Sequence, residues 1–192
     1  PVCWLEMPSL IDDYVMSPNK ELVACVDMTG EIYIWDLSEQ KKIMAIPEVV
    51  RGNVDYTRNI AFYDDEHLVC LRGENQLCKY NVNTGDLVSS IVVEGMNQLY
   101  SDGGKYVAVE VLEGFNIYDV SGEQITFSGN IPVTEGYMIG RDLLYFQEGK
   151  LIFVESLEGN LETNVNDEED VPSKVIINLY DYNVMAKQAK IH

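Results

Sequence analysis

The sequence predicts an all-β protein built from four similar sheets, each with four antiparallel strands. Three observations lead to this class. Short apolar runs alternate with turn-forming residues along the 192-residue chain, helical periodicity is absent nearly everywhere, and one short phrase returns four times at long intervals. Hydrophobic residues make up 46% of the sequence, which is enough to fill packed layers between sheets.

The repeated phrase places an aromatic residue before an acid or its amide, inside an apolar run. It reads IYIWDL at 32–37, LCKYNV at 77–82, FNIYDV at 115–120 and INLYDY at 177–182. The aromatic residues are separated by 45, 38 and 62 positions, and the third interval becomes 44 when the 18 residues of 156–173 are left out. A period of about 40–45 residues made of short strands is typical of a propeller blade.

Each repeat supplies four expected strands. In the first repeat these are DYVM, LVACV, IYIWDL and IMAI, separated by the turns SPNKE, DMTGE and SEQKK. The second repeat reads RNIAFY, LVCLR, LCKYNV and LVSSIVV, the third MNQLY, YVAVEV, FNIYDV and QITF, and the fourth DLLYF, LIFVES, VIINLYDY and VMAKQAKI. The expected blades span about 8–46, 57–93, 97–127 and 137–191, within a single propeller domain, 1–192.

The second run of every repeat is apolar at almost every position, as in LVACV and YVAVEV. A strand of this kind must be covered on both faces, and sheets stacked like wedges provide that cover. Glycines such as Gly30 and Gly85 fall in the turns, where a positive φ is needed. The recurrent aromatic residues are therefore expected to be packing residues between the sheets.

The periodic set of phrases resembles the WD-repeat β-propeller family. The matching residues are Trp35-Asp36, Tyr80-Asn81, Tyr118-Asp119 and Tyr180-Asp181, and SPNKELVA (17–24) and SDGGKYVA (101–108) match the family's turn between the first and second strands. The family's Gly-His pair and structural histidine are missing from all four repeats, so its histidine network is not expected. The resemblance implies a divergent propeller that acts as a protein-binding scaffold.

The number of repeats also leads to an expectation about assembly. The start, VCWLEM, resembles the last strand of a preceding blade, and there is no initiator Met. We therefore expect the chain to be part of a larger propeller. An open array exposes apolar sheet faces at its two ends. Two copies could pair those faces as a homodimer, or missing blades of a parent protein could cover them.

The net charge of −19 restricts the partners. It argues against nucleic acid and anionic lipid and favours a protein partner with a basic patch. No apolar run reaches the roughly 18 residues of a membrane span, and the start lacks the basic and apolar regions of a signal peptide. A cytoplasmic, intracellular protein is expected.

The four cysteines form no CxxC pair and are expected to be reduced and buried. Cys70 and Cys78 could face each other across a hairpin, which leaves a disulfide as the alternative. Because only two histidines accompany them, no structural zinc site and no other metal site is predicted.

Catalytic and cofactor-binding residues are not predicted either, and the chain is interpreted as a non-enzyme. His67 opens a strand and is expected to be a turn residue, and SDGGK at 101–105 is expected to be a hairpin turn rather than a phosphate cradle. The acidic clusters Asp12-Asp13 and 64–66 are expected to be solvated turns.

The segment 156–173 is the main candidate for a binding site. It carries no basic residue and six acids, and this predicts a disordered loop. The six are Glu158, Glu162, Asp167, Glu168, Glu169 and Asp170. The segment is either a tolerated insertion or an acidic arm that grips a basic partner. In the resembled family, loops between the second and third strands share the usual partner-binding rim with the loops between blades.

The preferred function is a non-catalytic protein-interaction scaffold or sensor module of a larger intracellular protein, binding through the rim loops. One alternative is a propeller enzyme or small-molecule binder that uses the central channel, where Arg58 and Arg141 could hold an anionic ligand. Another alternative is a structural half-propeller that pairs with a second half.

Overall fold

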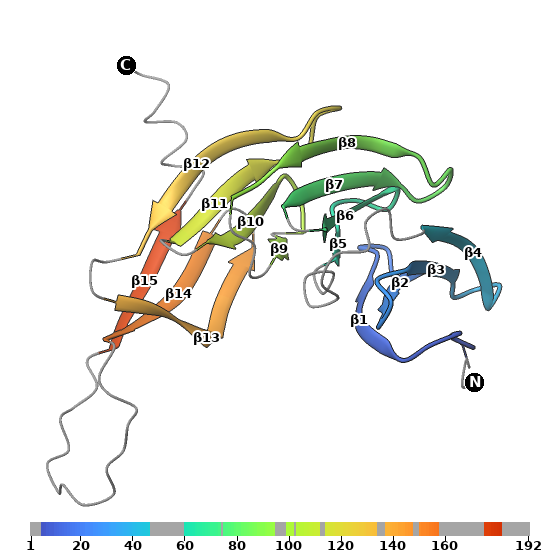
Figure 1. Ribbon diagram of the computed structural model, residues 1–192, viewed down its shortest axis with the longest axis horizontal. Helices are drawn as coiled ribbons and strands as arrows, with labels where there is room; N and C mark the ends of the chain where they lie inside the picture. The colour runs from blue at the N-terminus through green and yellow to red at the C-terminus, as the bar shows by residue number, and fades with distance from the viewer. Residues whose placement is uncertain are drawn as a thin grey trace, which may run out of the picture.

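The computed structural model describes residues 5–46, 60–73, 75–94, 99–101, 103–111, 114–133, 137–147, 150–157 and 175–181. These residues form fifteen strands and no helix. The strands build four antiparallel sheets that follow one another along an open arc (Figure 1). The predicted all-β class with repeated antiparallel sheets is confirmed.

The first two sheets each contain four strands in chain order. Sheet 1 consists of β1 (Ile11–Met16), β2 (Leu22–Asp27), β3 (Ile32–Asp36) and β4 (Lys41–Ile46). Sheet 2 consists of β5 (Ile60–Phe62), β6 (His67–Arg72), β7 (Gln76–Asn81) and β8 (Leu87–Val92). Neighbouring strands within a sheet are joined by short turns, as a meander requires.

The third and fourth sheets repeat the arrangement. Sheet 3 consists of β9 (Leu99–Ser101), β10 (Tyr106–Val111), β11 (Gly114–Asp119) and β12 (Thr126–Pro132). In sheet 4 the described strands are β13 (Tyr137–Gln147), β14 (Lys150–Leu157) and β15 (Val175–Asp181). The expected last strand of the fourth repeat, VMAKQAKI, lies outside the described residues.

The four phrases occupy one register position. In each sheet the aromatic residue lies on the third strand, opposite an apolar residue of the second strand. The pairs are Trp35–Val23, Tyr80–Leu68, Tyr118–Val107 and Tyr180–Leu151. In sheets 1 to 3 the pairing with the fourth strand also shifts register immediately before the aromatic residue. Such a bulge increases the local twist of a strand.

The core lies in layers between the sheets. We call the face that a sheet turns toward the next sheet in the chain its forward face, and the opposite one its backward face. The forward face of sheet 1 carries Ala24, Val26, Ile32 and Ile34, which pack against Leu68, Cys70, Cys78 and Tyr80 on the backward face of sheet 2. Each fully buried aliphatic side chain contributes about 1.5–3 kcal/mol.

The next two layers follow the same rule. Val69, Leu71 and Leu77 of sheet 2 pack with Val107, Val109 and Tyr118 of sheet 3. Ala108, Phe115 and Ile117 of sheet 3 pack with Phe146 and Leu151 of sheet 4. Trp35, Tyr80 and Tyr118 are only 8%, 5% and 3% exposed, which confirms that they are packing residues.

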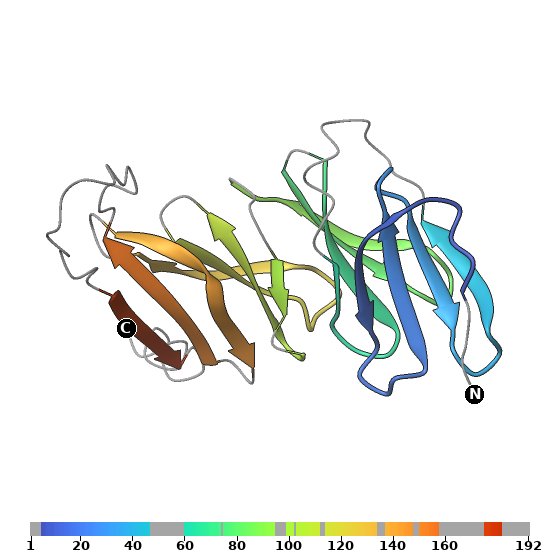
Figure 2. The same cartoon turned by 90° about the horizontal axis from the view of Figure 1, so that it is seen from below.

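The innermost strands set the curvature of the arc. β1 contacts β5, β5 contacts β9, and β9 contacts β13. Both views place sheets 1 and 4 at opposite ends of the arc (Figures 1 and 2). The backward face of sheet 1 and the forward face of sheet 4 are therefore the two ends of the stack.

One sequence expectation was wrong. Asp12 and Asp13 were expected in a solvated turn, but both lie within β1. Asp13 is partly buried, and this burial raises its pKa, although the backbone N–H groups of Tyr14 and Ile60 oppose the shift. The strand extends through the two acids because the apolar residues around them pair with β2 from Ile11 to Met16.

The expectation of buried thiols is confirmed for the three cysteines that the structure describes. Cys25, Cys70 and Cys78 are buried and free. Cys70 and Cys78 do face each other across β6 and β7, but they remain thiols. Burial raises the pKa of both, so they are poor nucleophiles at neutral pH. Within the same described ranges, no helix is long and apolar enough to cross a membrane.

Candidate functional site

One rim of the arc carries the turns that follow the first and third strands of the sheets. We call this the turn rim, and its described parts are residues 17–21, 37–40, 63–66, 82–86, 103–105 and 120–125. The turns after the second strands lie on the opposite rim, because neighbouring antiparallel strands run in opposite directions. β14, the second strand of sheet 4, ends at the opposite rim, and the acidic segment follows β14 in the sequence.

In sheets 1 to 3, the acid or amide that follows the aromatic residue closes a turn on the turn rim. The backbone N–H groups of Ser38 and Glu39 donate to Oδ1 of Asp36 at 2.8 and 2.9 Å, and the Ser38 hydroxyl donates at 2.7 Å. These bonds lower the pKa of Asp36, with the Glu39 N–H as the largest cause. This Asx turn replaces hydrogen bonds that the backbone would otherwise make to water.

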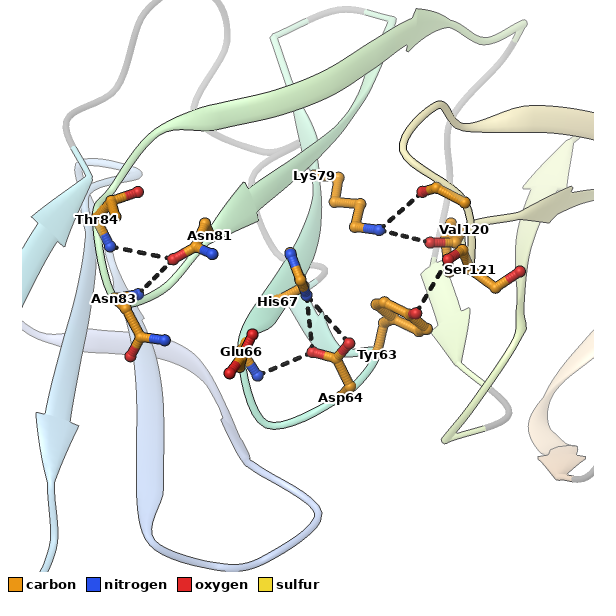
Figure 3. Close-up of polar contacts among 11 residues, drawn as sticks. Tyr63, Asp64, Glu66, His67, Lys79, Asn81, Asn83, Thr84, Val120 and Ser121 are labelled. Atoms are coloured by element: carbon orange, nitrogen blue, oxygen red, sulfur yellow. Dashed lines mark hydrogen bonds and ion pairs between the residues drawn. The ribbon is translucent and has the colours of Figure 1, made fainter.

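The other two described repeats use the same device. Asn83 and Thr84 donate their N–H groups to Oδ1 of Asn81 at 2.9 and 3.1 Å (Figure 3). The N–H and hydroxyl of Ser121 donate to Oδ1 of Asp119 at 2.9 and 2.6 Å. The phrase thus combines an aromatic residue that fills the core with an oxygen that fixes the next turn.

Asp119 also holds a charge partner. Lys105 Nζ lies 3.0 Å from its Oδ2. Burial alone would raise the pKa of Asp119, but the hydrogen bonds from Ser121 and the Lys105 ammonium lower it on balance. The ion pair ties the turn before β10 to the turn after β11.

Lys79 joins sheet 2 to sheet 3. Its side chain is almost fully buried, with 3% exposure, although it is a lysine. Its ammonium donates to the carbonyl oxygens of Val120 and Gly122 at 2.8 and 3.0 Å and lies 4.4 Å from the centre of the Tyr63 ring (Figure 3). Burial lowers the pKa of Lys79, while Asp64 and Asp119 oppose the shift.

Neighbouring side chains complete the same cluster. The Tyr63 hydroxyl donates to the carbonyl oxygen of Ser121 at 3.1 Å. His67 Nδ1 lies 2.9 Å from Oδ1 of Asp64, which also accepts the Glu66 N–H at 2.8 Å (Figure 3). His67 therefore supports the turn before β6, as expected. All these contacts fix backbone turns, and they make this part of the turn rim a structural element.

Lys79 was not singled out from the sequence. The available signal was a single lysine in an otherwise apolar position of LCKYNV, where the first repeat has Ile34. Its partners are backbone carbonyls 41 and 43 residues away. Because any sequence provides carbonyls, the pattern alone could not reveal them.

The predicted site residues lie largely outside the described residues. This holds for Glu158, Glu162, Asp167, Glu168, Glu169 and Asp170, and also for Arg58. Arg141 lies in β13. The acidic arm and the Arg58–Arg141 pair therefore stay predictions. Over the described ranges, no group of three His, Cys, Asp or Glu side chains is placed to hold a metal ion.

Comparisons with known proteins identify the fold. No family model matches the sequence, and no curated protein matches it. The structure is similar to the β-propeller domain of Cps50 (Swd1) from Myceliophteria thermophila, with a TM-score of 0.63 and 9% identity over 80% of this chain and 51% of that one.

Two further solved structures show the range of similar proteins. The WD40 repeats of RRP9 have a TM-score of 0.58 and 9% identity, over 79% of this chain and 46% of that chain. The dihydro-heme d1 dehydrogenase NirN has a TM-score of 0.60 and 12% identity, over 94% of this chain and 37% of the NirN chain. The similar structures thus include WD-repeat domains and an enzyme.

The structure therefore has the fold of a divergent WD-repeat-like β-propeller, as the repeated phrases predicted. The chain spans about half the length of the Cps50 and RRP9 chains it matches, at 51% and 46%.

Proposed function

We propose that the chain is a non-catalytic protein-interaction module of an intracellular protein, and that it binds a basic partner through the rim that carries the acidic segment. The fold supports the general class, because WD-repeat propellers commonly mediate protein interactions. The charge supports the kind of partner, because −19 on 192 residues attracts a basic surface and repels an acidic one.

The pairing of the two strands that flank the acidic segment in the sequence is the observation that carries the proposal. β14 and β15 are paired from Lys150–Asp181 to Ser156–Val175. The end of β14 and the start of β15 therefore lie side by side, with residues 158–174 between them in the sequence. Within the sequence between these strands, residues 158–173 carry six carboxylates and no basic residue, and such a charge density increases the rate and strength of binding to a basic patch.

The test measures binding to immobilised peptides rich in lysine and arginine. Neutralising three acids of the segment, with Asp167→Asn, Glu168→Gln and Glu169→Gln, is expected to weaken binding about tenfold at physiological salt, because each exposed pair contributes about 0.5 kcal/mol. Replacing 158–173 with an Asn-Gly turn is expected to weaken it further. Added salt should reduce binding of the unmodified chain.

The matched control neutralises three acids on the turn rim, with Glu66→Gln, Asp86→Asn and Glu123→Gln. These residues are exposed, and the change in net charge is the same. Less than about twofold weakening is expected from this control. If the two triple variants lose the same affinity, the weaker binding is caused by net charge and not by the position of the acids. Unchanged affinity of the deletion variant at low and physiological salt would refute the acidic arm.

A further inference from the structure

The backward face of sheet 1 exposes apolar side chains that are buried at the equivalent positions of sheet 2. On β1, Tyr14 is 69% exposed and Met16 is 45% exposed. They pair with Cys25 and Val23 of β2. We call this surface the end face, and its described members are Tyr14, Met16, Val23, Cys25, Tyr33 and Trp35.

The register identifies the equivalent positions. In sheet 2, Ile60 pairs with Cys70 and Phe62 with Leu68, just as Tyr14 and Met16 pair with β2. Ile60 and Phe62 are only 7% and 3% exposed, because sheet 1 packs on them. In sheets 2, 3 and 4 the equivalent surface is covered by the preceding sheet, whereas no sheet among the described residues covers the end face.

Four members of the end face are already buried, at 4–8% exposure, so its exposed apolar part is Tyr14 and Met16. Leu5 and Met7 pack against the cluster of Val23, Cys25, Tyr33 and Trp35. They leave Tyr14 exposed, and the neighbouring Leu10 is 77% exposed. Trp35 Nε1 is buried but has no hydrogen-bond partner among the described residues. A buried indole N–H without an acceptor is unfavourable.

At the other end of the arc, the register of sheet 4 can be compared with that of sheet 1. On sheet 1, Ala24–Ile34 and Val26–Ile32 are the register pairs that pack onto sheet 2. In sheet 4 the same two register positions are filled by Ile152–Leu179 and Val154–Ile177. Because all four residues are apolar, sheet 4 repeats the sequence pattern of a forward face. In register and sequence pattern, the two end sheets of the arc thus correspond to the two sides of the interface that joins neighbouring sheets.

From this complementarity we propose that a second copy of the chain places its β13–β15 sheet on the end face, and that the reciprocal contact closes two arcs into one ring. Contacts between different surfaces of identical subunits form rings when the rotation closes. One chain spans 51% and 46% of the Cps50 and RRP9 propeller chains, so two arcs together approach the length of one such propeller.

The charge of the chain makes this association distinguishable from binding at the acidic segment. Two copies each carry −19 and repel each other, whereas the contacting faces are apolar. Salt should therefore strengthen the pairing of copies but weaken binding to basic peptides. Because the two salt dependences are opposite, a result that refutes one proposal does not refute the other.

The test is the solution mass of the full chain by light scattering and sedimentation equilibrium. The expected mass is twice the 21.7 kDa of one chain, and the expected dimer becomes tighter at higher salt. Tyr14→Asp should weaken the dimer more than about tenfold, because a carboxylate would be buried without a partner. Leu87→Asp is the matched control, since Leu87 is 52% exposed on β8, away from the end face.

The complementary surface is tested by Leu179→Asp, which should also give monomers. An equimolar mixture of the Tyr14→Asp and Leu179→Asp variants should recover dimers, because one of the two interfaces is intact in the mixed pair. Three results would overturn the proposal. The unmodified chain could be monomeric at high salt, Tyr14→Asp could leave the dimer unchanged, or the chain could form polymers larger than two copies. Far-ultraviolet circular dichroism verifies that each variant is folded.

Discussion

Replacing Gly114 with alanine is expected to destabilise the protein by about 3–5 kcal/mol, a large part of the roughly 5–15 kcal/mol that keeps an ordinary domain folded. Gly114 begins β11 with φ +137°, and a Cβ there would overlap the carbonyl oxygen of Ile131 and lie 2.9 Å from Cα of Pro132. The neighbouring strand cannot retreat easily, because Phe115 and Ile131 are fully buried. Urea unfolding, followed by circular dichroism, measures the loss.

Gly103→Ala is the control for this substitution. Gly103 also has a positive φ, +73°, but no atom lies within 4 Å of the position of its Cβ. Only the backbone strain of about 1–2 kcal/mol is expected. Equal losses at the two glycines would mean that β11 and β12 are not as closely paired as described.

Lys79→Met is expected to destabilise the protein by about 2 kcal/mol. The substitution keeps most of the apolar stem but leaves the carbonyl oxygens of Val120 and Gly122 without their donor. Each unsatisfied buried acceptor is unfavourable by about 1–3 kcal/mol, and the release of a buried charge offsets part of this. The free energy of unfolding in urea, measured at low and high salt, should show a loss that salt changes little.

Lys105→Met provides the comparison at the same turn. The Lys105–Asp119 ion pair is formed by a lysine side chain that is 52% exposed. Exposed pairs contribute about 0–1 kcal/mol and are screened by salt. If Lys105→Met destabilised the protein as much as Lys79→Met, the buried ammonium would not be the main polar contact between sheets 2 and 3.

The repeat could be predicted from sequence because two constraints coincide at each phrase. The aromatic residue must fill the layer between two sheets, and the acid must cap the following turn. Tyr118 and Asp119 do this in sheet 3, and Tyr80 does it in sheet 2, where the amide oxygen of Asn81 replaces the acid. Both constraints are local in sequence, so they leave a readable pattern.

Long-range contacts left no comparable pattern. Gly114 looks like an ordinary turn glycine until β12 is placed against it. Asp13 looks like a solvated acid until Ile60 of the neighbouring sheet is placed beside it. In both cases the deciding neighbour comes from another strand, and the residue alone does not specify it.

The packing between neighbouring sheets accounts for the stability of the arc and for the exposure of apolar side chains on sheet 1. Sheets 2 and 3 are covered on both faces, whereas Tyr14 and Met16 of sheet 1 remain exposed at positions that its neighbour buries. The proposed rim contact and the proposed pairing of copies use different surfaces of this arc, and they respond to salt in opposite directions.

Hydrogen exchange resolved strand by strand tests the stacked arrangement most directly. Amides of β6 and β10, in sheets covered on both faces, should exchange slowest, near the rate set by global unfolding. Those of β1, whose side chains Tyr14 and Met16 are exposed, should exchange faster in the monomeric Tyr14→Asp variant. Uniform exchange across all strands, or slower exchange in β1 than in β6, would contradict an open arc of stacked sheets.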